Sequence, residues 1–129
     1  MRRDDDRVAD ILAAAAAIHE RFVRLTLAEL HNRPDAVKAT FYDVVVIGEA
    51  IRDLLGRRDA AGNAIEADAA IVVAHPDIPW SGWVGMRDMV THQYFRAAPE
   101  IVWRDYQAGE LDRLIACCRI WLESRHFGR

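Results

Sequence analysis

Apolar residues recur at intervals of three and four along much of the chain, and this spacing limits its possible folds more than any other feature. With about 3.6 residues per turn, such a set falls on one face of an α-helix. We therefore expect two long amphipathic helices, at residues 4–30 and 34–55, that bury these faces in the core of a bundle. The first face comprises Val8, Ile11, Leu12, Ala15, Ile18, Phe22, Leu25 and Leu30. The second comprises Val37, Phe41, Val44, Val45, Gly48, Ile51, Leu54 and Leu55.

Part of the second segment is open to another interpretation. The run from Val44 to Ile47 is typical of a strand, but its flanks carry helical spacing and no turn signals, so we expect a helix. Pro34 suits the first turn of this helix, and the residues before it break the first pattern. The sequence thus predicts two long helices that are joined by a short turn.

The rest of the chain predicts shorter helices. Residues 56–62 are rich in arginine and glycine and predict a loop, and Pro76 and Pro79 predict an extended connector before a helix with Ser81 as its N-cap. We expect a polar, frayed tail at residues 124–129. The four further helices are expected at about residues 65–74, 82–94, 99–107 and 111–123. The predicted fold is a single all-α domain over residues 1–129, an antiparallel helical bundle with short additional C-terminal helices.

Composition narrows the classes of function. A hydrophobic content of 52% and a charged content of 29% are typical of a globular protein. The net charge of -3 argues against a uniformly basic nucleic-acid surface, although all but one of the 17 basic residues are arginine, which binds phosphate well. No apolar run reaches about 18 residues and the N-terminus lacks the core of a signal peptide, so we expect no membrane span and a cytoplasmic location. The adjacent Cys117 and Cys118 match neither a zinc pair nor a disulfide framework, so at least one of them is expected to be a packed thiol.

One stretch, residues 85–95, combines an arginine, a carboxylate, a histidine and a tyrosine on an apolar background. In a helix, Arg87 and Tyr94 share one face, whereas Asp88 and His92 share a neighbouring face. Arg87 and His92 then lie roughly 140° apart around the helix axis, at 100° per residue. A long arginine side chain narrows that gap, and a second copy of the helix from a partner subunit could close it more easily.

Arginine and histidine without a metal cluster suggest phosphate chemistry. Histidine has a reference pKa near 6.5, which suits proton transfer at neutral pH, so His92 is the candidate acid or base, and Arg87 would supply charge for a phosphorane-like transition state. RNA contains its own nucleophile, the 2′-hydroxyl, so a base or acid and a cation are sufficient for cleavage. Asp88 could orient the imidazole or raise its pKa, or it could be an ordinary exposed carboxylate; the pair Arg87 and His92 could also be structural. The five histidines are scattered and no phosphate-binding glycine loop occurs, so we expect no metal and no cofactor.

Other residues have competing interpretations. Gly48 permits close helix contact, and the adjacent Glu49 could support the site or could pair with Arg52 three residues later. The aromatic side chains of Trp80, Trp83 and Trp103 are expected in the core or at an interface in preference to stacking on bases.

The arrangement Arg87-x4-His92-x-Tyr94 resembles the R-x4-H-x-Y motif of HEPN-domain proteins of the HepT-like group. Two positions depart from the family pattern, with Asp88 in place of the usual asparagine and Gln93 in place of the usual glycine. The resemblance extends over residues 4–122. Three further blocks occur in the expected order: Ile47-Gly48-Glu49-Ala50, Pro76-Asp77-Ile78-Pro79-Trp80 and Glu100-Ile101-Val102-Trp103.

The resemblance implies an all-α homodimer in which the motif helices of two subunits face each other. It further implies the toxin of a type II toxin–antitoxin pair, a metal-independent ribonuclease with Arg87 and His92 as catalytic residues and Asp88 and Glu49 in support. The partner would be a minimal nucleotidyltransferase antitoxin that transfers AMP to Tyr94; the alternative is a tyrosine whose ring packs while its hydroxyl meets water. Two other hypotheses are a catalytically silent helical partner of a nucleotidyltransferase and a plain structural dimer.

Overall fold

The computed structural model describes residues 3–92 and 95–127. Residues 126 and 127 are described by their backbone alone. Apart from one isolated bridge between Arg58 and Ala64, all regular structure in these residues is helical, which confirms the all-α prediction. The elements are α1 (Asp4–Arg24), α2 (Leu27–His31), α3 (Pro34–Leu54), α4 (Ala70–Ala74), α5 (Trp80–His92), the 3-10 helix η1 (Phe95–Ala97), α6 (Ala98–Gln107) and α7 (Glu110–Phe127).

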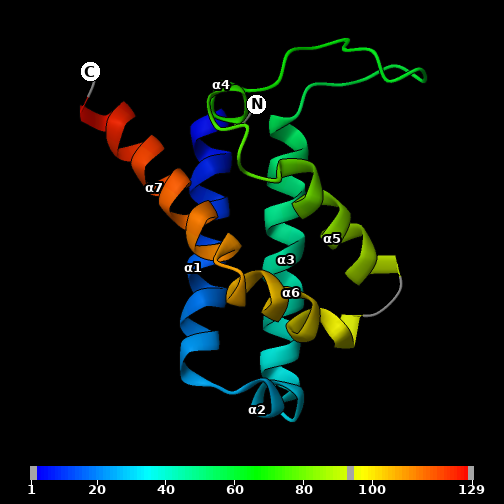
Figure 1. The fold of residues 1–129 in the computed structure, drawn as a ribbon, viewed down its shortest axis with the longest axis vertical. Coiled ribbons are helices and arrows are strands. Elements are labelled where there is room, and N and C mark those ends of the chain that lie inside the picture. Colours follow the sequence, from blue (N-terminus) through cyan, green and yellow to red (C-terminus); the bar gives the residue numbers. More distant parts are fainter. Residues whose placement is uncertain (1–2, 93–94, 128–129) are drawn as a thin grey trace.

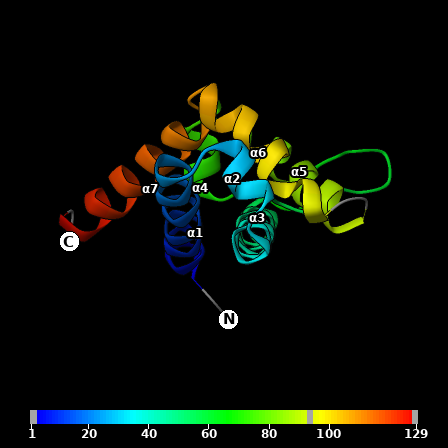
Figure 2. The same ribbon diagram turned by 90° about the horizontal axis from the view of Figure 1, so that it is seen from below.

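The two long helices α1 and α3 lie side by side and antiparallel, as Figure 1 shows. Viewed along their axes, they form one layer, and α5, α6 and α7 lie along one side of it (Figure 2). The helix α5 packs on α3, and α7 packs on α1. The predicted apolar faces meet in this core, where Ile11, Ile18, Ile47 and Ile51 are fully buried. The arrangement positions α5, which carries the motif, against the middle of α3.

The prediction of one continuous helix over residues 4–30 is wrong. The first helix, α1, ends at Arg24, and α2 begins at Leu27 with Thr26 as its N-cap. The Thr26 hydroxyl accepts a hydrogen bond from the Glu29 backbone N–H at 3.1 Å, and the Glu29 carboxylate accepts one from the Thr26 N–H at 3.0 Å. This capping box satisfies two N–H groups that would otherwise lack partners at a helix start, and it allows the chain to turn towards α3.

The prediction for α3 is confirmed to within one residue, but the helix expected at residues 65–74 is shorter. Only Ala70–Ala74 is helical. Residues 65–68, which precede this helix, lie beside residues 56–57 at the start of the loop. The Gly56 N–H donates to the Asp68 carboxylate at 2.8 Å, and the Ile65 N–H donates to the Arg57 carbonyl oxygen at 2.8 Å. These hydrogen bonds hold residues 65–68 beside the start of the loop, so the helix begins only after Ala69.

The motif helix begins at Trp80, two residues earlier than expected, so the assignment of Ser81 as its N-cap is wrong. The Trp80 indole Nε1 donates a hydrogen bond to the His75 carbonyl oxygen at 2.9 Å, which fixes the connector before the helix. The described part of this helix ends at His92, and the remaining two residues of the expected helix lie outside the described residues.

The C-terminal helices begin where the sequence predicts, within one residue. The last helix, however, continues through Phe127, so the expectation of a frayed tail is wrong for residues 124–127, while residues 128–129 lie outside the described residues. The Arg125 side chain donates to the Asp5 carboxylate at 2.8 Å and so ties this end of α7 to the start of α1. The buried thiols of α7 pack in the core, as expected: burial raises the pKa of Cys117 to about 11 and that of Cys118 to about 12.

Candidate active site

The site forms where α5 crosses α3, at Gly48. A Cβ atom added to this glycine would lie 2.6 Å from the Cγ of Arg87 and would overlap its Cβ. Glycine is therefore required for the stem of the arginine to lie on the α3 backbone. The prediction that Gly48 permits close helix contact is confirmed, and the contacting group is the motif arginine.

Two carboxylates hold the guanidinium group of Arg87. One terminal nitrogen, Nη1, donates to Oδ1 of Asp88 at 2.6 Å, and the other, Nη2, forms an ion pair with Oε1 of Glu49. The arginine side chain is mostly buried, at 18% exposed, whereas the side chains of Glu49 and Asp88 are 49% and 50% exposed. Glu49 thus pairs with the motif arginine across the interface of α3 and α5. The alternative partner considered for it was Arg52.

The third nitrogen of the guanidinium, Nε of Arg87, is buried and has no acceptor in the part of the chain that the structure describes. An ion-paired arginine with one unused donor can exchange its carboxylate partners for the oxygens of a phosphate group, which matches the guanidinium fork. Glu49 and Asp88 are half exposed, so water can hydrate their carboxylates when a phosphate group replaces them on Arg87.

His92 lies at the described end of α5 and is exposed. Among residues 3–92 and 95–127, its imidazole has no hydrogen-bond partner, and the Asp88 carboxylate is directed to Arg87. The structure therefore does not bring Asp88 to the imidazole, which was one of the roles considered for it. Tyr94, the predicted modification site, lies outside the described residues.

The two faces of α5 differ in character. The inner face carries Trp80 and Trp83, which are 5% and 2% exposed, in agreement with their expected place in the core. The outer face carries Gly85, where an added Cβ would meet no atom of the described chain within 4 Å, and Met89, which is 45% exposed. His92 lies one turn beyond Met89. The outer face of the motif helix is thus partly apolar, and no other described residue covers it at Gly85.

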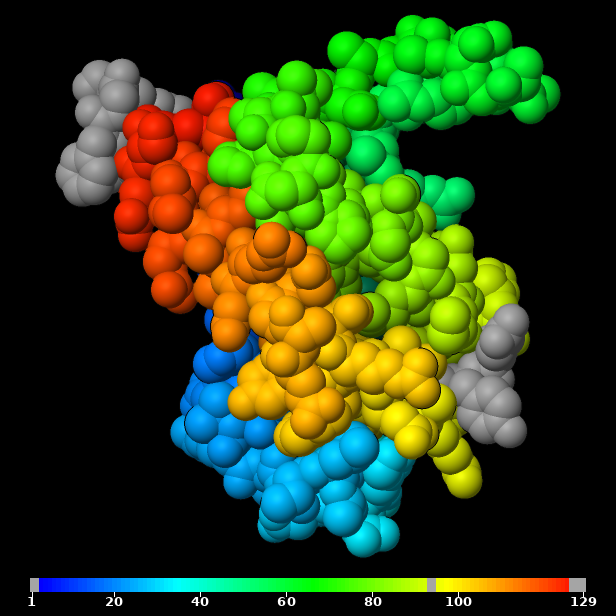
Figure 3. All heavy atoms as spheres, viewed as in Figure 1, coloured from blue at the N-terminus to red at the C-terminus, as the bar shows by residue number. Residues whose placement is uncertain are grey.

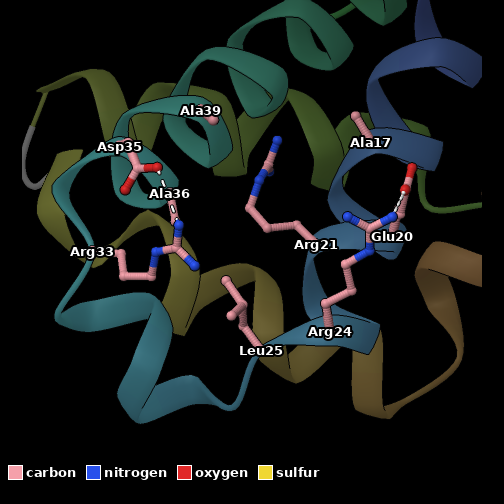
Figure 4. Close-up of a pocket in the computed structure, with 9 residues that line it drawn as sticks. All are labelled: Ala17, Glu20, Arg21, Arg24, Leu25, Arg33, Asp35, Ala36 and Ala39. Carbon is pink, nitrogen blue, oxygen red and sulfur yellow. Dashed lines mark hydrogen bonds and ion pairs between the residues drawn. The ribbon is translucent and has the colours of Figure 1, made fainter.

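A second cationic region lies away from the motif, in a hollow of about 390 Å³ between α1 and the start of α3 (Figure 4). Each of its three arginines already has a carboxylate partner. Arg21 pairs with Asp43 at 2.9 Å, and burial raises the pKa of that carboxyl even though Arg21 acts in the opposite direction. The other two pairs are Arg24 with Glu20 at 2.6 Å and Arg33 with Asp35 at 3.6 Å. Of these three ion pairs, that of Arg21 with Asp43 joins α1 to α3, and the other two are local to one helix.

The described residues contain no group of three or more His, Cys, Asp or Glu side chains placed to share a metal ion. None of the helices in this part of the chain is both long and apolar enough to cross a membrane.

Comparison with known proteins identifies a family and a relative of this chain. The profile of the family described as Ribonuclease HepT-like matches residues 11–119. A protein of Methanocaldococcus jannaschii named "Putative RNase MJ0127" is 28% identical over 79 residues, which are 61% of this chain and 54% of that protein. The chain thus spans about half the length of this relative. No solved structure matches.

Proposed function

Because the chain belongs to the HepT-like ribonuclease family, we propose that it is a metal-independent ribonuclease and the toxin of a type II toxin–antitoxin pair. The observation that carries this proposal is the position of Arg87. Its stem lies on the α3 backbone at Gly48, its guanidinium pairs with two half-exposed carboxylates, and an exposed histidine follows five residues later on the same helix.

The reaction uses the 2′-hydroxyl of RNA as the nucleophile. The 2′ oxygen attacks the adjacent phosphorus while the bond from phosphorus to the 5′ oxygen breaks, which leaves a cyclic phosphate and a free 5′-hydroxyl. His92 either removes the proton from the 2′-hydroxyl or supplies one to the departing 5′ oxygen. Arg87 stabilises the negative charge that develops on the phosphate oxygens. To do so, it must leave Glu49 and Asp88, which hold it in the free protein.

We place the working site between two subunits. Arg87 packs towards α3, whereas His92 lies about 140° around the α5 axis, so one subunit directs the two side chains apart. The outer face of α5, with Gly85 and Met89, leaves room for the same helix of a second subunit. In such a two-fold dimer, His92 of one subunit lies beside the shared face, and the guanidinium of the other subunit's Arg87 would reach it after leaving Glu49 and Asp88.

The proposed antitoxin is a minimal nucleotidyltransferase that transfers AMP to the phenolic oxygen of Tyr94. This tyrosine lies two residues after His92 in the sequence. A nucleotide attached there would add negative charge and bulk beside the catalytic pair and would exclude RNA.

A growth assay tests the ribonuclease. Expression of the wild-type chain should arrest growth and degrade cellular RNA, whereas Arg87→Ala and His92→Ala should do neither. His19→Ala and Arg119→Ala are controls on other helices, at a half-buried and an exposed position, and should remain toxic. Toxicity that persists in both motif variants would exclude the catalytic roles.

Intact-mass measurement tests the modification. Co-expression with the adjacent nucleotidyltransferase should add the mass of AMP to the wild-type chain and not to Tyr94→Phe. An unmodified wild-type chain, when that enzyme is active on another substrate, would contradict this part of the proposal.

One observation favours a second candidate, a catalytically silent helical partner of a nucleotidyltransferase. Both terminal nitrogens of Arg87 are occupied by carboxylates of the same chain. For this candidate, the purified protein would leave RNA intact at every concentration and would still bind the nucleotidyltransferase.

A further inference from the structure

A second feature of the surface lies beyond the motif, in a groove of about 510 Å³ at the junction of α2, the first turns of α3, and η1. In the space-filling view, the yellow segment of η1 and α6 lies beside the cyan segment of α2 and α3 (Figure 3). The groove is lined by His31, Pro34, Val37, Lys38, Phe95 and Arg96.

The charge of this groove differs from that of the other cationic regions. Lys38 and Arg96 are both exposed, and neither has a carboxylate partner within the described residues. At the edge of the groove, His31 lies 4.0 Å from the Glu100 carboxylate. Arg87 and the arginines of the hollow between α1 and α3, by contrast, are all ion-paired. In a chain of net charge -3, both cations of this groove are thus available to an anionic ligand.

An aromatic ring stands between these cations and the motif. Phe95 is 43% exposed, and its ring lies 5.9 Å from that of Phe41 and 5.8 Å from the Arg96 guanidinium. Apolar atoms of Pro34 and Val37 complete the wall. Exposed aromatic rings next to unpaired cations are the combination that binds single-stranded nucleic acid, where bases stack and phosphates pair.

The groove lies on the same side of α3 as the proposed catalytic site. Phe41, which contacts Phe95, and Gly48, which contacts Arg87, are separated by seven residues of α3, about 10 Å along its axis. Seven residues are close to two full turns, so both positions lie on the same side of the helix. A strand whose phosphate is bound at Arg87 would therefore reach the groove within a few nucleotides.

We infer that this groove binds a single-stranded segment of the RNA substrate, with phosphates at Lys38 and Arg96 and a base stacked on Phe95. The inference rests on the proposed ribonuclease function, because it assigns the groove to the same substrate. It defines the substrate class more narrowly, since a base that stacks on Phe95 must be unpaired.

The test measures binding separately from cleavage. The probe is a fluorescent oligoribonucleotide of mixed sequence with 2′-O-methyl groups, which lacks the nucleophile and stays intact. Relative to the wild-type protein, Lys38→Ala/Arg96→Ala should bind it about tenfold more weakly at low salt. A plot of log affinity against log salt concentration has a negative slope, and its magnitude should decrease by about 1.4. This corresponds to two lost phosphate contacts, at about 0.7 per contact for single strands. The control Arg113→Ala/Arg119→Ala removes the same charge from exposed positions on α7 and should leave affinity and slope unchanged.

The aromatic contact has its own pair of variants. Phe95→Leu should weaken binding about tenfold, and Phe95→Trp should preserve it, because stacking requires a flat ring. Circular dichroism melting curves establish that each variant is folded, and Lys38 and Arg96 are exposed, so their loss should not affect the core.

Several outcomes would overturn the inference. Equal affinity of the wild type and Lys38→Ala/Arg96→Ala would show that the groove does not hold the strand. Loss of binding in the charge variant with no effect of Phe95→Leu, together with equal affinity of the wild type for a polyglutamate peptide, would indicate an acidic protein partner instead.

Failure of the inference and failure of the proposed function are distinguishable. Wild-type protein that cleaves unmodified RNA, with groove variants that bind and cleave equally well, would refute the groove alone. Wild-type protein that does not cleave RNA, but whose binding to the probe depends on Lys38, Arg96 and Phe95, would refute the ribonuclease and support the groove.

Discussion

The backbone of Gly48 on α3 lies directly against the stem of Arg87 on α5, so that a Cβ at position 48 would stand 2.6 Å from the arginine Cγ. The contact ties the placement of the motif arginine to a glycine 39 positions earlier in the chain. It also explains why the motif helix crosses α3 at this point.

Replacement of this glycine should destabilise the fold. Alanine is the better helix former by about 1 kcal/mol, but in Gly48→Ala the new Cβ meets the first carbons of Arg87, which are fixed by the α5 backbone. We expect the free energy of unfolding to fall by about 1–3 kcal/mol, the usual cost of overpacking. Urea denaturation measures it, and a gain in stability would show that the two helices separate easily.

Gly85 provides the opposite case. An alanine here meets nothing within 4 Å in the described chain, so Gly85→Ala should stabilise a subunit by about 0.5–1 kcal/mol. If the outer face of α5 packs on a second subunit, the same methyl group should weaken the dimer. Sedimentation equilibrium measures association and urea denaturation measures stability; unchanged association would place the dimer interface elsewhere.

Glu49 should act by positioning Arg87. In Glu49→Ala, the arginine loses one of its two carboxylate partners, so its guanidinium is less well oriented but carries more net charge. We expect kcat on RNA to fall about tenfold while affinity for the uncleavable oligonucleotide stays the same or increases. The control is Glu20→Ala, which removes an exposed ion-paired carboxylate on α1. Weaker binding together with unchanged kcat would contradict a positioning role.

Mixed dimers test the composite site. A dimer of one Arg87→Ala subunit and one His92→Ala subunit retains one complete site only if each site takes its arginine and histidine from different subunits. Random assortment makes half of the dimers mixed, with one of two sites intact, so refolding equal amounts should restore about a quarter of wild-type activity. Each variant refolded alone is the control. A mixture as inactive as the separate variants would show that the site lies within one subunit.

Asp43 should make stability depend on pH in an unusual direction. Its carboxyl lies 9% exposed between α1 and α3, and burial raises its pKa above the ordinary value despite the Arg21 ion pair. A raised pKa in the folded state contributes stability below the unfolded pKa, and this contribution is lost as pH rises through the folded value. The wild type should therefore lose stability relative to Asp43→Asn as pH increases from 3 through the raised pKa, and the difference should then level off. Unfolding curves for both proteins measure it, and the opposite trend would show that the ion pair outweighs burial.

The apolar spacing by itself determined the two long helices and most of their buried faces, because helical periodicity is a local property and Ile11, Ile18 and Ile51 have few other ways to leave water. It assigned Val45 to the second face, but Val45 is half-buried and Ile47, which was not assigned, is fully buried. The capping box of Thr26 and Glu29 is also a local sequence pattern that indicates a new helix start. The apolar residues continue at helical spacing across it, however, and this favoured the prediction of one unbroken helix. The motif residues Arg87 and His92 were also identified from spacing and resemblance, within one short segment.

Only the tertiary structure decided which groups surround them. The pairing of Arg87 with Glu49, the overlap that makes Gly48 necessary, and the meeting of Lys38 with Arg96 join residues 38 to 58 positions apart. Such pairs depend on where helices cross and on how the chain turns at α2 and η1. Packing of the whole core sets these positions, and no local pattern in the sequence encodes them.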